Sequence, residues 1–207
     1  MFRVYLTPEE IEKIKKLEGQ ARGQTIRNAL ETTELMEGKE GLEKLKARLK
    51  EISCWVDIYE DYKKINIFDL FPLWYDILPI VVAAELFAWD EEKLKQFGAY
   101  NQRVSFIEKY LVKYFVSLDI VRMLAPERWR KHYSVGDLSF LNLKEDEGYA
   151  TLQLKNFTGH PAFCYLLLGY FVSANKFVVH FKEMTGEETK CVFRGDPYHE
   201  YLIKWTK

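Results

Sequence analysis

The chain is poor in cysteine, with three among its 207 residues: Cys54, Cys164 and Cys191. An odd number at irregular spacing argues against a secreted disulfide scaffold, because such domains carry paired cysteines in a regular framework. We interpret Cys54 as a reduced thiol in the core, where free cysteine behaves as a small hydrophobic residue.

A surplus of either charge is also missing. Lysine and arginine number 30, aspartate and glutamate number 31, and the formal net charge is −1. Nucleic-acid-binding domains normally carry a basic surplus or stripe, so the charge balance gives no support to a nucleic-acid partner. We interpret the one basic cluster, residues 128–132, as a solvated helix end.

Long apolar runs are absent as well. The most apolar stretch, residues 71–89, contains Asp76, Pro79 and Glu85, whereas a membrane span needs roughly 20 mostly apolar residues. The first five residues do not show the basic region and apolar run of a signal peptide. We therefore expect no membrane span and a cytoplasmic location.

Sequence motifs of the common enzyme classes are not found. No glycine-rich phosphate-binding loop follows a predicted strand, and no Gly-x-Ser-x-Gly element is present. We expect a protein that is not an enzyme.

Apolar and aromatic residues are plentiful, at 48% and 15% of the chain, which is ample for a packed core. Residues 1–52 have dense alternating charge, typical of exposed helices. Aromatic residues become frequent from residue 53 onward. We predict an N-terminal helical extension at 1–52 and a ligand-binding domain at 53–207.

The apolar spacing changes from a helical period to an alternating one near residue 135. Helices are predicted from Pro8, at 25–36, 42–52, 71–89 with a bend at Pro79, 90–102, 104–118, 119–123, 127–132 and 161–176. Strands are predicted at 137–144, 149–155, 177–181, 190–193 and 201–205. The fold class is therefore α+β: an N-terminal helical part packed on a small antiparallel sheet that the helix 161–176 crosses.

Four potential metal ligands stand in the last quarter of the chain: Cys164, Glu188, Cys191 and His199, spaced C-x23-E-x2-C-x7-H. Two thiolates, an imidazole and a carboxylate make a tetrahedral donor set for zinc, and four protein ligands would make that zinc structural. The spacing alone leaves another interpretation open, with two buried cysteines, a solvated Glu188 and a turn-capping His199. His180 is the first substitute for His199.

The order and spacing of these residues resemble those of the 4-vinyl-reductase-like domain family. The order is Cys-x4-Gly-Tyr (Cys164, Gly169, Tyr170), then Glu188 and Cys191, then a final ligand eight positions later. The resemblance implies a structural zinc on Cys164, Glu188, Cys191 and His199, although the family has cysteine at the last position. It also implies an internal pocket for hydrophobic or aromatic molecules. The wider superfamily includes haem–nitric-oxide-binding domains and vesicle-tethering subunits.

The leading functional hypothesis is a zinc-stabilised sensor domain for a small hydrophobic or aromatic ligand. Such a domain would form a homodimer and signal through an unidentified protein partner. We interpret four residues as ligand-binding candidates because they combine ring surface with polar tips: Trp129, His132, Tyr133 and His160. The alternatives are an assembly subunit without a ligand and an accessory protein of tetrapyrrole vinyl reduction.

Overall fold

The structure of the chain is a computed structural model that describes residues 4–104, 118–176 and 183–206. It has the predicted α+β fold. The helices are α1 (Pro8–Lys15), α2 (Gly23–Glu51), α3 (Trp74–Leu86), α4 (Glu91–Val104), α6 (Leu118–His132) and α7 (Pro161–Lys176). The strands are β1 (Gln20–Arg22), β2 (Leu70–Pro72), β3 (Asp137–Lys144), β4 (Tyr149–Lys155), β5 (Glu183–Lys190) and β6 (His199–Thr206).

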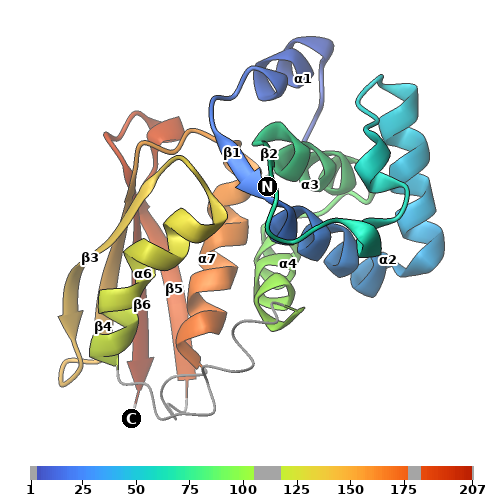
Figure 1. Ribbon diagram of the computed structural model, residues 1–207. Coiled ribbons are helices and arrows are strands. Elements are labelled where there is room, and N and C mark those ends of the chain that lie inside the picture. The colour runs from blue at the N-terminus through green and yellow to red at the C-terminus, as the bar shows by residue number, and fades with distance from the viewer. Residues whose placement is uncertain (1–3, 105–117, 177–182, 207) are drawn as a thin grey trace.

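The larger sheet has the strand order β3-β4-β6-β5, and each neighbouring pair is antiparallel. Alternate residues of β6 are buried, from His199 through Tyr201 and Ile203 to Trp205. The Tyr201 ring packs on Phe171 of α7, so the buried face of the sheet is the one that α7 covers. In Figure 1, α7 and α4 lie between this sheet and the N-terminal helices.

Helix α1 begins where the sequence predicts. The Thr7 hydroxyl accepts a hydrogen bond from the Glu10 backbone N–H, and the Glu10 carboxylate accepts one from the Thr7 N–H. The two helices predicted at 25–36 and 42–52 form one element, α2, which Gly38 interrupts with a backbone φ of 75°. Pairing of β1 with β2 was not predicted, because each strand has three residues and too little sequence for a period.

Two helix predictions need correction. The helix predicted at 71–89 begins at Trp74 and ends at Leu86, because residues 70–72 pair with β1. The helices predicted at 119–123 and 127–132 are one continuous α6, which passes through Pro126. A proline removes one helical hydrogen bond, and burial of Trp129 in the core offsets that loss.

The C-terminal strands are confirmed in part. The strands predicted at 137–144 and 149–155 have the observed bounds, as does the helix at 161–176. The strand predicted at 190–193 is wrong: β5 runs over the polar residues 183–190, and residues 192–194 form a short 3-10 helix, η3. Pairing with β6 overrides the weak strand propensity of β5. The predicted strand 177–181 and most of the predicted helix 104–118 lie outside the described residues.

Helix α2 packs against α3 and α4, across the predicted boundary at residue 52, and that boundary stays a prediction. Within the described residues, no helix is both long enough and apolar enough to cross a membrane. Helices α4 and α7 cross closely at Gly98 and Gly169. This crossing positions the first turn of α7, which carries Cys164.

Candidate metal centre

Helix α7, strand β5 and strand β6 each contribute to one buried cluster. Cys164 lies in the first turn of α7, Glu188 near the end of β5, Cys191 directly after β5, and His199 at the start of β6. His160 positions that first turn, because its Nδ1 accepts a hydrogen bond from the Ala162 N–H at 3.1 Å. The side chains of Cys164, Cys191 and His199 are almost fully buried.

The four ligand atoms lie within 4.8 Å of one another. The Sγ atoms of Cys164 and Cys191 are 3.5 Å apart, and the Cys164 Sγ lies 3.8 Å from the His199 Nδ1. Edges of a tetrahedron with metal–ligand bonds of about 2.0–2.3 Å measure about 3.3–3.8 Å. The two separations therefore match edges of such a tetrahedron, with room for an ion at its centre.

The hydrogen bonds of His199 show which nitrogen faces the cluster. Its Nε2 lies 3.2 Å from the Phe157 carbonyl oxygen, which can only accept, so Nε2 carries a proton. In the neutral imidazole Nδ1 is then an acceptor, and it lies 3.0 Å from the Glu188 Oε1. Two acceptors at this distance repel unless a cation lies between them, either a proton or a metal ion.

Burial determines the protonation state of the two thiols, Cys164 and Cys191. It raises the pKa of Cys164, with a smaller contribution from the negative charge of Glu188, and it raises the pKa of Cys191 as well. Without a cation both thiols are therefore protonated at neutral pH. A bound metal ion would displace these protons, since thiolate is the form that coordinates.

Surrounding groups orient the candidate ligands. The Arg194 Nη1 lies 3.5 Å from the Glu188 Oε2, and its Nη2 donates to the Glu188 carbonyl at 3.0 Å. The Cys191 N–H donates to the Asp196 carboxylate at 2.8 Å. Outer contacts of this kind accompany metal ligands in proteins. The sequence pattern named the four ligands but did not indicate Arg194, Asp196 or Phe157, which have no characteristic spacing.

Three of the four predicted ligand-binding residues have partners in the protein, whereas the buried His132 Nδ1 has no hydrogen-bond partner within the described residues. The Trp129 Nε1 donates to the Val135 carbonyl, and the Tyr133 hydroxyl donates to Asp76, both at 2.8 Å. The His160 Nδ1 accepts the hydrogen bond from the Ala162 N–H that is described above. The pKa of His132 falls to about 4 because of burial and, secondarily, Arg128. Binding by these four residues stays a prediction.

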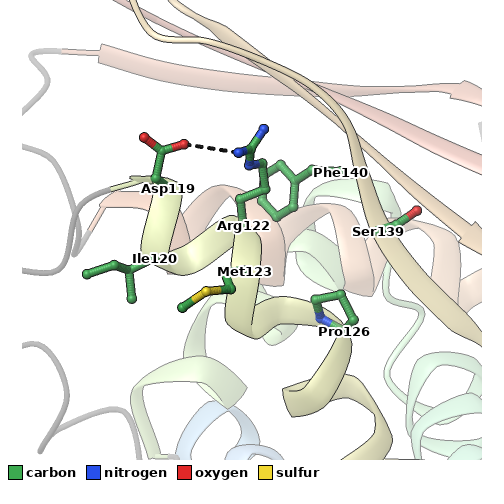
Figure 2. A pocket seen from close by; sticks show the side chains of 7 residues that line it. All are labelled: Asp119, Ile120, Arg122, Met123, Pro126, Ser139 and Phe140. Carbon is green, nitrogen blue, oxygen red and sulfur yellow. Dashed lines mark ion pairs between the residues drawn. The ribbon is translucent and has the colours of Figure 1, made fainter.

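A pocket of about 580 Å³ lies elsewhere, between α6 and β3 (Figure 2). It combines an apolar lining with one ion pair, Arg122 to Asp119 at 3.5 Å. The lining residues are Asp119, Ile120, Arg122, Met123, Pro126, Ser139 and Phe140. None of the four predicted ligand-binding residues is among them. Sequence reasoning missed this pocket because it depends on the packing of α6 against β3.

Comparison with known proteins identifies the fold. No family model matches the chain, and no curated protein matches it in sequence. An H-NOX protein from S. oneidensis, solved in the Fe(II)NO ligation state, is similar in structure at 12% identity and a TM-score of 0.64. That likeness covers 90% of this chain and 99% of that one. An oxygen-binding H-NOX domain related to soluble guanylate cyclases is similar at 11% identity and a TM-score of 0.62, over 90% of this chain and 95% of that one.

The fold is thus similar to that of H-NOX domains. The likeness does not reach the 4-vinyl-reductase-like family itself. It contradicts the prediction of structural zinc as the cofactor, because solved structures of this fold are described with Fe(II) and with haem. The zinc prediction rested on the sequence resemblance and on the donor types, which several metal ions accept.

Haem itself can be tested against the described residues. Haem iron is bound in proteins by His, Cys, Met or Tyr. Of the residues that line the described pocket, only Met123 is of these types, and it is 69% exposed. Both ring nitrogens of His199 already have partners, Glu188 and Phe157. The described residues therefore do not fit a haem in this pocket.

Proposed function

We propose that this chain is a small-molecule sensor domain that signals through a protein partner and is not an enzyme. The observation that carries the proposal is the pocket between α6 and β3, in a fold whose solved examples include an oxygen-binding domain. Residues 119–126 of α6 line the pocket. Tyr133, which directly follows the C-terminal end of α6, forms an isolated β-bridge with Ala21 of β1. A ligand that moves α6 would therefore move its contact with the N-terminal part.

The pocket favours a hydrophobic or aromatic ligand with one polar group. Its volume of about 580 Å³ lies within the range of small-molecule sites. Ile120, Met123, Pro126 and Phe140 supply apolar surface. Arg122 supplies a donor for an acidic or carbonyl oxygen, since its pairing with Asp119 is loose at 3.5 Å.

We propose in addition that Cys164, Glu188, Cys191 and His199 bind a divalent transition-metal ion. The proposal is supported by the approach of their four ligand atoms within 4.8 Å and by the facing acceptors of His199 and Glu188. Four protein ligands leave no open position, so the ion would connect α7 to β5 and β6 rather than act on a substrate. The free energy of binding would then contribute directly to folding.

Native mass spectrometry with elemental analysis tests both parts. Purified protein should carry one metal ion per chain and retain, or bind on addition, a small aromatic molecule. Ser139→Trp should obstruct the pocket and weaken aromatic binding, whereas Leu141→Trp, on the same strand but outside the lining, should not. Equal aromatic binding by both variants would refute the pocket assignment.

One observation favours the alternative of an assembly subunit. Ile120, Met123 and Leu141 are exposed apolar residues, at 39%, 69% and 43%, on the two elements that form the pocket. If this face is a homodimer contact, Met123→Glu should convert a dimer to a monomer in sedimentation velocity. A wild-type monomer would exclude this alternative. We retain membership of the 4-vinyl-reductase-like family and a cytoplasmic location as parts of the proposal.

A further inference from the structure

A carboxyl group lies buried at the junction between the N-terminal helices and the rest of the chain. Asp76 is 1% exposed in α3, which is otherwise almost wholly apolar. Its Oδ2 accepts a hydrogen bond from the Tyr133 hydroxyl at 2.8 Å. Its Oδ1 has no partner within the described residues. Buried polar atoms are nearly always paired, so this oxygen calls for an explanation.

The junction around Asp76 is held by few other polar contacts. Strand β1 pairs with β2 on one side and meets the segment after α6 on the other. The Gln20 N–H donates to the Ser134 hydroxyl at 2.8 Å, and the Ser134 N–H donates to the Gln20 carbonyl at 3.0 Å. Arg22 donates to the carbonyls of Lys131 and Phe68. Among the contacts made by residues 131–134, the Tyr133–Asp76 bond reaches α3.

We propose that Asp76 and Tyr133 form a proton-dependent latch, which is closed when the Asp76 carboxyl is neutral and opens when it ionises. Burial of a neutral carboxyl group in this site costs little free energy, because one of its oxygens accepts the hydrogen bond from Tyr133. A carboxylate there has one hydrogen bond, whereas an open junction would let water reach both oxygens. Ionisation therefore favours separation of Tyr133 and Ser134 from α3 and β1.

The surrounding charged and titratable groups do not offset the burial of Asp76. The Thr25 hydroxyl beside it donates to the Arg22 carbonyl, and the Tyr59 hydroxyl donates to the Tyr75 carbonyl. The groups that face the junction are Arg22, Thr25, Tyr59, Lys131, His132, Tyr133 and Tyr170. Burial raises the pKa of Asp76 to about 7, although the hydrogen bond from Tyr133 opposes the rise.

The pH window follows from the two states. In the open state Asp76 has a pKa near the ordinary value of 3.8, and in the closed state near 7. Between these values opening releases a proton, so the opening constant rises about tenfold per pH unit. Above about pH 7 both states are ionised and the constant levels off. The latch involves neither the pocket nor the metal cluster, and its test needs no ligand. It acts at the same contact of Tyr133 with β1 through which the proposed sensor would pass its signal.

Hydrogen exchange of the metal-loaded or metal-free full chain tests the latch. The readout is the Ser134 amide, measured from pH 5 to 8 and corrected for the intrinsic exchange rate. In the wild type its opening constant should rise about 50-fold from pH 5 to 7 and level off near a roughly 100-fold rise by pH 8. Asp76→Asn should remove this dependence while the Asn oxygen still accepts from Tyr133.

Tyr133→Phe is the second variant. This variant removes the Tyr133–Asp76 hydrogen bond, which favours the ionised carboxylate. The pKa of Asp76 in the closed state should therefore rise, and the opening constant should level off at a higher pH. A merely structural role would speed opening equally at every pH. A wild-type profile without pH dependence, or a Tyr133→Phe profile that levels at the same or lower pH, would overturn the latch. The Tyr133→Phe result decides the question even if Asp76→Asn does not fold.

Discussion

Gly169 offers the sharpest test of how α7 is positioned. A Cβ at this residue would lie 1.9 Å from the Lys95 carbonyl oxygen and 2.7 Å from the Lys95 Cα, both backbone atoms of α4. Gly98 of α4 makes the reciprocal approach, since a Cβ there would lie 1.9 Å from the Leu166 carbonyl oxygen. The two backbones are in contact, so no side-chain rotation can relieve the steric clash that Gly169→Ala creates.

The cost can be worked from these distances. The closest comfortable carbon–oxygen contact is about 3.3 Å, so the two helices must separate by about 1.4 Å at the crossing. Leu94, Phe97 and Leu166, which are buried beside it, would lose contact. Overpacking of this kind costs about 1–3 kcal/mol, and a clash between two backbones belongs at the upper end. For a domain of this size that is a fall in Tm of about 6–12 °C.

Urea unfolding followed by circular dichroism measures this change. Gly38→Ala is the matched control, because a Cβ there meets nothing within 4 Å and only the positive φ of 75° is strained. Gly38 has a φ of 75° and a ψ of 176°, a region that is essentially restricted to glycine, so the control should lose about 1–3 kcal/mol. Gly169→Ala should lose a similar amount, but unlike the control it should weaken Co²⁺ uptake, because Cys164 lies on the displaced helix. A loss below about 1 kcal/mol would refute the close crossing.

Three further predictions concern separate parts of the chain. Cys191→Ala should abolish uptake of metal measured by elemental analysis, and an unchanged metal content would remove Cys191 from the cluster. Asp76→Asn should raise the free energy of unfolding at pH 8 by up to about 4 kcal/mol and should give no gain at pH 3. The reason is that the raised pKa of Asp76 lowers the stability of the wild type as pH rises from 3.8 to about 7. Equal gains at both pH values in urea titrations would contradict this prediction. Thr7→Ala should cost about 0.5–2 kcal/mol in thermal unfolding through loss of the capping box, and Thr7→Ser should restore it.

Local sequence predicted the elements that carry their own signals. Pro161 at the first position and the apolar run after it predict α7, and Gly148 with φ of 72° completes the acidic hairpin turn between β3 and β4. Strand β5 carries no such signal. Its residues are polar, and its position depends on pairing with β6, the strand that follows it in the chain.

The candidate site divides in the same way. The residue types at 164, 188, 191 and 199 identify a donor set, because coordination chemistry depends on the side chains themselves. The distances between them, the proton on the His199 Nε2 and the contact of Arg194 with Glu188 exist only after α7 and the sheet pack together. The zinc prediction failed at this point, since donor type alone does not select one ion.

The sequence by itself therefore determined the fold class, the bounds of α7 and the hairpin, and the candidate ligands, all of which follow from residue chemistry and short-range periodicity. Tertiary structure alone decided the pocket between α6 and β3, the crossing at Gly98 and Gly169, and the burial of Asp76 beside Tyr133. The helix crossing and the Asp76–Tyr133 contact join segments far apart along the chain, and the pocket depends on how α6 packs against β3. The free energy of such contacts depends on which surfaces meet, and no local pattern contains that information.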